Sequence, residues 1–247
     1  MNRLAVTTRE AIRHILFTTG TYGAVTRLRA MRGAGGSAHL RERDIRSRFN
    51  SIYDTSVWRH GNDEIPRSGG GSSLSATSAI REILPSLLDD LHVQTLLDIG
   101  CGDFSWMRHV NLSQNYVGID IVETVVASNK SNFEGPRRTF FSLDAVVDEL
   151  PNADAVLCRE VLFHLSFSDI RKLLRNILSK DRSYFICTSD RQTNFNSDIP
   201  TGDFRLLNLE AWPLRLPAPI RVFDDCTVAP RRILGVWDAK RLRRLAR

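Results

Sequence analysis

The chain has 247 residues, of which 42% are hydrophobic and 25% are charged, proportions that are ordinary for a soluble globular protein of one domain with appendages. No apolar run approaches the roughly 18 residues of a membrane-spanning helix, and the patch at 15–17 is too short for a signal-peptide core. The four cysteines form no CxxC pair, which disfavours a metal or redox site and is typical of buried thiols in a cytoplasmic protein; they are Cys101, Cys158, Cys187 and Cys226.

The net charge of +6 is unevenly distributed along the chain. Residues 1–48 contain ten arginines and three acids, and residues 231–247 contain seven basic residues and one acid, which leaves residues 49–230 with a net charge of −7. Enzymes that act on nucleic acids more often carry basic surface around the active site. The acidic middle of the chain therefore disfavours RNA or DNA as the substrate.

Residues 1–48 are predicted to be a basic, partly helical N-terminal extension. Its apolar residues recur at helical spacing among arginines; they are Leu4, Ile12, Ile15, Leu16, Val25 and Leu28. Such a pattern can lie on an anionic membrane surface, which predicts a peripheral membrane contact. The alternative, which we favour, is a loosely docked extension. Gly33, Gly35, Gly36 and Ser37 predict a flexible break after it.

Residues 49–92 are predicted to form a helical, glycine-rich lid region before the core. A helix around Ile45–Tyr53 leads to Trp58, and a glycine-serine loop follows at 67–73. A second helix begins near residue 75 or 77 and runs through Leu87, with a break or kink at Pro85. The loop is either a linker or a lid whose bare backbone approaches a ligand, and both interpretations stay open.

Residues 93–237 alternate apolar runs with amphipathic stretches, which predicts βα units and a doubly wound, mostly parallel sheet, with a basic tail over 238–247. The expected strands are Thr95–Ile99, Tyr116–Ile119, Arg138–Ser142, Ala155–Cys158, Tyr184–Thr188, Ile220–Phe223 and Ile233–Trp237. The expected helices are Trp106–Val110, Val122–Asn132, Ala145–Glu149 and Phe167–Leu178, the last capped by Ser166 or Ser168.

The first strand of this core is followed by an acid and two glycines, Asp98, Gly100 and Gly102. In open α/β sheets ligands bind at the carboxyl ends of strands, and glycines let the backbone turn close to a ligand. A dinucleotide site needs G-x-G-x-x-G, but its third position here is Ser105. An acid at 98 would crowd a pyrophosphate, whereas it can pair with the ammonium group of S-adenosylmethionine.

Two further acids follow the next two strands. Asp120 ends the second strand, 22 residues after Asp98, where a carboxylate can accept hydrogen bonds from both hydroxyls of a ribose. Asp144 follows the third strand and can accept a hydrogen bond from an adenine amino group, or it caps a helix. Three acids at three consecutive strand ends are far more specific than one.

These segments resemble the class I S-adenosylmethionine-dependent methyltransferases. LDIGCGDF (97–104), YVGIDI (116–121) and FFSLDA (140–145) resemble their first three motifs, and DAVLCREVLFHLS (154–166) resembles their fourth strand and the entry to the next helix. The resemblance spans about residues 74–237 and implies a Rossmann-like sheet of seven strands, the last one antiparallel. It implies S-adenosylmethionine as the cofactor, bound by Asp98, Gly100, Cys101, Gly102, Asp120, Ile121, Asp144 and Arg159. Phe104 departs from the pattern, because many members have a third glycine there.

Methyl transfer to oxygen needs a base beside the acceptor hydroxyl. His164 can titrate near neutral pH and is the first candidate, with helix entry packing as its alternative. Glu160 lines the methyl pocket or pairs with Arg159. The polar segment 190–217 suits a hydroxyl-rich acceptor, and its TGDFRLLNLE stretch resembles a bacterial subgroup that acts on small molecules or glycans. The sequence therefore predicts methylation of a small molecule or saccharide at oxygen, with an RNA or protein methyltransferase and a nicotinamide-dependent oxidoreductase as alternatives.

Overall fold

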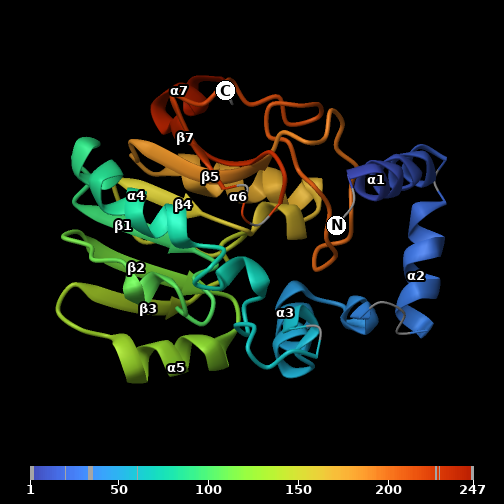
Figure 1. The fold of residues 1–247 in the computed structure, drawn as a ribbon, viewed down its shortest axis with the longest axis horizontal. Helices are drawn as coiled ribbons and strands as arrows, with labels where there is room; N and C mark the ends of the chain where they lie inside the picture. Colours follow the sequence, from blue (N-terminus) through green and yellow to red (C-terminus); the bar gives the residue numbers. More distant parts are fainter. Residues whose placement is uncertain are drawn as a thin grey trace.

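The computed structural model describes residues 3–19, 21–32, 36–59, 61–225, 227 and 229–245. Seven strands form one sheet in the order β3-β2-β1-β4-β5-β7-β6 (Figure 1). They are β1 Thr95–Ile99, β2 Asn115–Asp120, β3 Arg138–Ser142, β4 Ala155–Cys158, β5 Tyr184–Asp190, β6 Arg221–Asp224 and β7 Arg232–Asp238. Strands β1 to β5 are parallel and β7 pairs antiparallel with both β5 and β6. The predicted seven-stranded sheet is confirmed.

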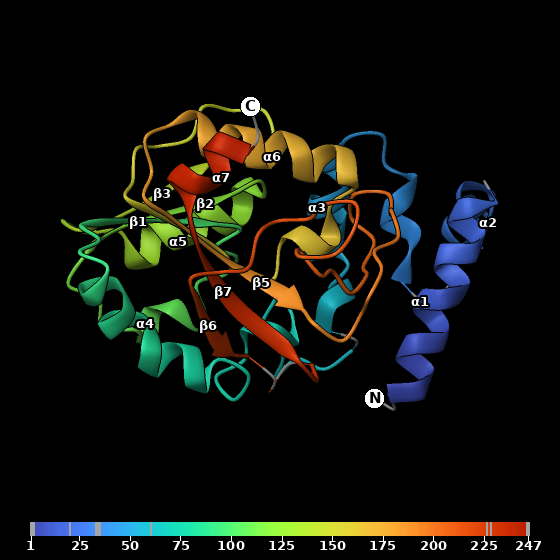
Figure 2. The same ribbon diagram turned by 90° about the horizontal axis from the view of Figure 1, so that it is seen from above.

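Helices cover both faces of this sheet (Figure 2). The helices are α1 Arg3–Thr18, α2 Tyr22–Arg32, α3 Ile45–Asp54, α4 Ser78–Asp90, α5 Glu123–Phe133, α6 Phe167–Ser179 and α7 Ala239–Leu245. On one face α4 packs Leu84 and Leu88 against β1 and β4, and on the other α6 packs Ile170 and Ile177 against the same sheet. Alternate residues of a strand point to opposite faces, so Leu96 and Leu97 serve these two cores in turn.

The order of the strands fixes where a ligand can bind. The chain runs outward from β1 through β2 to β3 and then crosses back to place β4 on the other side of β1. The carboxyl ends of β1 and β4 therefore flank the point where the strand order reverses, which is the usual binding crevice of an open α/β sheet. The crossover into β5 is α6, whose first turn is capped by the Ser166 hydroxyl, 3.1 Å from the Asp169 amide.

Four local predictions need correction. The helix α4 continues through Pro85, because the buried leucines around it hold the helix against the sheet. Residues 145–149 form a turn, because the Asp144 and Asp148 carboxylates bond nearby backbone amides. Residues 106–110 contain only a short 3₁₀ turn, Met107–His109. The predicted basic tail forms α7 and buries Ala239 and Leu242.

The N-terminal helices α1 and α2 lie to one side of the sheet, next to the segment that follows β5 (Figures 1 and 2). Buried hydrogen bonds join α2 and the turn after it to residues 202–203. The extension is therefore docked by specific polar contacts and is not loose. Of the predicted break, Gly33 and Gly35 lie outside the described residues, as does Cys226. None of the described helices is both long and apolar enough to cross a membrane.

Candidate functional site

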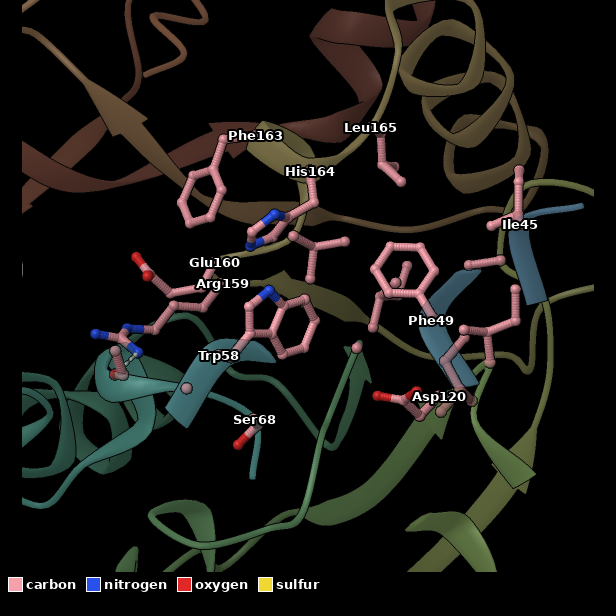
Figure 3. Close-up of a pocket in the computed structure, with 18 of the residues that line it drawn as sticks. Ile45, Phe49, Trp58, Ser68, Asp120, Arg159, Glu160, Phe163, His164 and Leu165 are labelled. Atoms are coloured by element: carbon pink, nitrogen blue, oxygen red, sulfur yellow. Dashed lines mark hydrogen bonds between the residues drawn. The ribbon is translucent and has the colours of Figure 1, made fainter. Parts of the chain in front are cut away.

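A cavity of about 250 Å³ lies at the carboxyl ends of β1, β2 and β4 (Figure 3). Its wall combines three groups of residues that are far apart in the sequence. The strand ends contribute Ile99, Gly100, Asp120, Ile121, Asp144, Arg159 and Glu160; the glycine-serine loop contributes residues 68–72; and an aromatic wall comes from Phe49, Tyr53, Trp58, Phe163, His164 and Phe204. Most predicted site residues thus meet in one place.

The turn after β1 has the conformation that its glycines permit. Gly100 has φ +72° and Gly102 φ +57°, and a Cβ at position 100 would lie 2.6 Å from Cγ2 of Val161. The amides of Gly100 and Cys101 both donate to the Ile119 carbonyl. Phe104 also has a left-handed backbone, with φ +56°, and the packing of its buried ring against Tyr116, Phe133 and Phe140 compensates for the strain.

Asp120 and Asp144 line the cavity as predicted. The Asp120 carboxylate accepts hydrogen bonds from the amides of Gly102 and Val122, both at 3.0 Å, and burial raises its pKa in spite of them. Asp144 accepts from the Val146 amide at 3.0 Å, so it also closes its own turn, and burial raises its pKa too. Ile121 adds an apolar surface between them. Their binding to ribose and adenine stays a prediction.

Asp98 does not line the cavity, and the same holds for Cys101 and Gly102. Because Ile99 faces the cavity, the preceding residue of the strand faces the other side. There the Asp98 carboxylate accepts a 2.6 Å hydrogen bond from the Tyr116 hydroxyl, and burial raises the pKa of Asp98 to about 7. Cys101 is also buried, and Ser68 lies against Gly102. These three residues therefore lie outside the lining of the cavity, and their contact with the cofactor stays a prediction.

The glycine-serine loop is part of the cavity wall, so it does more than connect two helices, while its action as a lid stays a prediction. Asp103 holds the loop by accepting from the Arg67 amide at 2.7 Å and from the Ser68 hydroxyl at 2.6 Å. On the other side Arg159 donates to the Gly71 carbonyl at 2.7 Å. The loop therefore covers the turn after β1 and links it to the end of β4. Asp103 lies inside the first motif, but no local pattern indicated that it would bond to the loop at 67–68.

Arg159 and Glu160 line the cavity and also belong to a buried network of charges. Arg159 forms a 3.0 Å ion pair with Asp225, and both side chains are 3% exposed. Glu160 pairs with Arg232 at 2.8 Å, so the predicted partner, Arg159, is wrong. Burial raises the pKa of Glu160, although Arg232 and Arg159 act to lower it. Glu160 also has a left-handed backbone, with φ +63°, a strain that is common at functional sites.

His164 lies among the aromatic rings, beside Trp58 and Phe163 (Figure 3). Its Nδ1 is 3.0 Å from the Asp203 carbonyl oxygen. A carbonyl can only accept, so Nδ1 carries the proton and the neutral ring keeps a lone pair on Nε2. Burial lowers the pKa of His164 to about 4, which leaves the ring neutral at pH 7. Sequence reasoning found His164 but gave Phe49 and Phe204 no role, because the aromatic wall comes from separate segments.

The charged side chains of the cavity wall indicate which nucleotide cofactor fits. Among the described residues that line the cavity, three are acidic and one is a cation; they are Asp120, Asp144, Glu160 and Arg159. Carboxylates accept from ribose hydroxyls and an adenine amine, and their charge suits a sulfonium cation. A dinucleotide would instead bring two phosphates next to these acids. The residues present therefore fit S-adenosylmethionine.

Comparison with known proteins agrees with this fit. A family model described as a methyltransferase domain matches residues 97–180, a range that begins within β1 and includes β2 to β4, Asp120, Asp144 and His164. The chain therefore carries a methyltransferase domain, and its cavity fits S-adenosylmethionine as the cofactor. No protein of curated function matches it significantly in sequence.

Solved structures show the same fold as this methyltransferase at low sequence identity. Magnesium protoporphyrin IX methyltransferase from Synechocystis PCC 6803, with bound S-adenosylmethionine, has a TM-score of 0.55 and 15% identity over 79% of this chain and 97% of that one. Human N-acetylserotonin methyltransferase, also with S-adenosylmethionine, has a TM-score of 0.55 and 13% identity over 88% and 68%. The PH0226 protein from Pyrococcus horikoshii OT3 has a TM-score of 0.51 and 17% identity over 73% and 97%.

In the methyltransferase, S-adenosylmethionine supplies a methyl group on a positively charged sulfur. The strand-end half of the cavity, with Asp120, Ile121 and Asp144, would hold the nucleoside, because that is where acceptors for its hydroxyls and amine lie. The aromatic half, with Trp58 and His164, is then left for the methyl acceptor. The glycine-serine loop lines the same cavity and would help to shield a bound cofactor from water.

Proposed function

We propose that this methyltransferase transfers the methyl group to a hydroxyl oxygen of a small molecule or saccharide, with His164 as the base. The observation that carries the proposal is the state of His164: Nδ1 is held by the Asp203 carbonyl, the ring is neutral, and the ring lies in the aromatic half of the cavity. A neutral imidazole with a lone pair on Nε2 is the form that removes a proton from a hydroxyl.

The size and chemistry of the aromatic half support a small acceptor. The cavity is covered by the loop at 68–72 and closed by the rings of Phe49, Trp58 and Phe204. Aromatic faces pack well against flat rings and against the apolar faces of sugars. A duplex RNA would need an open basic surface, whereas Arg159 is the one cation among the described residues that line this cavity.

The proposed reaction gives a role to each group of the cavity wall. S-adenosylmethionine, when bound, would supply an electrophilic methyl group with the sulfur as its leaving group, and the acceptor hydroxyl would give up its proton. His164 Nε2 takes the hydroxyl proton, and the Asp203 carbonyl stabilises the imidazolium that results through Nδ1. Alignment of acceptor, methyl and sulfur supplies much of the rate. Glu160, held by Arg232, lies in the same wall and can accept a hydrogen bond from a second acceptor hydroxyl.

The test is a transfer assay with methyl-labelled S-adenosylmethionine against cell extracts separated into glycans, small metabolites, lipids, RNA and protein. We expect label in the glycan or small-metabolite fraction, at an oxygen. His164→Gln should lose about 10²–10⁴-fold in transfer rate, the usual contribution of a general base, while calorimetry shows unchanged cofactor affinity. Label in RNA or protein alone would overturn the acceptor, and full activity of the variant would overturn the base.

A further inference from the structure

We infer that α2, the turn at 38–41 and the start of α3 position His164, so that they are positioning elements of the active site. The inference rests on the proposed role of His164. The turn at residues 201–203 connects the N-terminal extension to His164. His164 contacts the inner side of this turn, and residues of the N-terminal extension contact its outer side.

On the inner side the turn is bonded directly to the His164 residue. The Asp203 carbonyl accepts from Nδ1 of the imidazole at 3.0 Å, and the Gly202 amide donates to the His164 carbonyl at 2.8 Å. The same two segments are bonded once more, because the Arg205 amide donates to the Phe163 carbonyl at 3.1 Å. The position of this turn therefore sets both the backbone of His164 and the proton on its ring.

On the outer side each residue of the turn is held from the N-terminal extension. The Tyr22 hydroxyl donates to Asp203 Oδ2 at 3.0 Å, with Arg29 Nη1 3.5 Å from the same oxygen. His39 Nε2 donates to the Gly202 carbonyl at 2.8 Å, and Arg48 Nη1 to the Thr201 carbonyl at 2.9 Å. Asp203, Tyr22 and His39 are all buried. The four contacts come from α2, the turn at 38–41 and α3.

The chemistry of Asp203 explains why this matters to His164. Its side chain and its carbonyl belong to one residue, so a carboxylate fixed by Tyr22 and Arg29 also fixes the direction of the carbonyl. Burial and the neighbouring carboxylate raise the pKa of Tyr22 to about 12, so its hydroxyl stays a donor at all working pH values. If the carbonyl turns away, Nδ1 loses its acceptor, and the ring no longer prefers the tautomer with a free lone pair on Nε2.

The test reads the tautomer of His164 without needing an acceptor substrate. Long-range ¹H–¹⁵N NMR of the histidine rings is recorded from pH 3.5 to 8, and the His164 signals are those missing from His164→Gln. The variants are Tyr22→Phe with Arg29→Gln, and the matched control is Arg27→Gln, an exposed arginine on the same helix. Calorimetric binding of S-adenosylmethionine checks that the cofactor half is folded. If the double variant fails that check, Tyr22→Phe alone is measured.

In the wild type and in the control we expect one tautomer, with the proton on Nδ1, and a pKa of His164 about 4. In the Tyr22 and Arg29 variant we expect mixed tautomers at neutral pH, with cofactor affinity within about twofold of wild type. The pKa of His164 should not rise in this variant, because the hydrogen bond to the Asp203 carbonyl acts to raise it and would be lost. An unchanged single tautomer would overturn the positioning role. Failure of the proposed function is a separate result, because it would appear as full transfer activity in His164→Gln.

Discussion

Replacing Asp120 by asparagine tests the cofactor site most directly. The carboxylate already accepts from the amides of Gly102 and Val122, both at 3.0 Å, and its two oxygens keep further lone pairs for the two hydroxyls of a ribose. Asparagine offers one oxygen, and its NH₂ group then faces a hydroxyl or an amide as a second donor. One charge-assisted hydrogen bond is worth about 1.5–3 kcal/mol, so the affinity for S-adenosylmethionine should fall roughly 10- to 100-fold.

The free energy of unfolding should change less than the cofactor affinity in this variant. Burial raises the pKa of Asp120, which means that the folded protein holds this charge at a cost. Asparagine removes that cost, which offsets part of the lost bond to the backbone. Isothermal calorimetry measures the affinity and urea unfolding measures the stability, with Glu123→Gln on the exposed start of α5 as the control. Binding within twofold of wild type would refute the placement of the ribose at Asp120.

Four other predictions follow from the same contacts. Because burial lowers the pKa of His164 to about 4, the transfer rate should hold down to about pH 5; an acid limb near 6.5 would contradict this. The pKa of Asp98 is about 7 in the folded protein against 3.8 for the free group, so its contribution to the stability of the fold is present at low pH and is lost as the pH rises from 4 to 7. The free energy of unfolding of Asp98→Asn, measured in urea, should therefore rise relative to that of the wild type over this pH range. A difference between the two proteins that stays constant with pH would refute this. Gly100 has φ +72°, and a Cβ at this position would lie 2.6 Å from Val161. The free energy of unfolding of Gly100→Ala in urea should therefore be about 2–4 kcal/mol lower than that of the wild type, and Val161→Ala should restore part of it. An unchanged free energy of unfolding would contradict the tight turn. The basic N-terminal helices expose four apolar side chains, Ile12, Ile15, Leu28 and Met31. We expect the protein to sediment with anionic vesicles, and a variant with Ile12→Asn and Ile15→Asn to do so less. Equal binding to neutral vesicles would exclude a membrane contact that charge assists.

Several features of the fold were predictable because their signal is local. Each strand of the core is a short apolar run bounded by polar residues, and the strands β1, β3 and β4 begin and end where the sequence predicted. The acids Asp120 and Asp144 were found because they follow such runs at the carboxyl end, and parallel strands bring these ends together. The helix α6 has a capping serine and one apolar face, and both signals lie within a single segment.

The sequence by itself predicted the strands to within two residues at each end and the class of fold. Through the resemblance of its motifs to a known family it also predicted the cofactor, and it named His164 as the candidate base. Only the tertiary structure decided which face of β1 Asp98 takes, that Glu160 pairs with Arg232, 72 residues away, and that the N-terminal helices hold the turn beside His164 through Tyr22 and Asp203. The reason is physical: hydrophobic periodicity and turn chemistry act between neighbours in the chain, so one segment carries them. Contacts such as Tyr22 to Asp203 depend on how separate elements pack, and no local pattern encodes that packing.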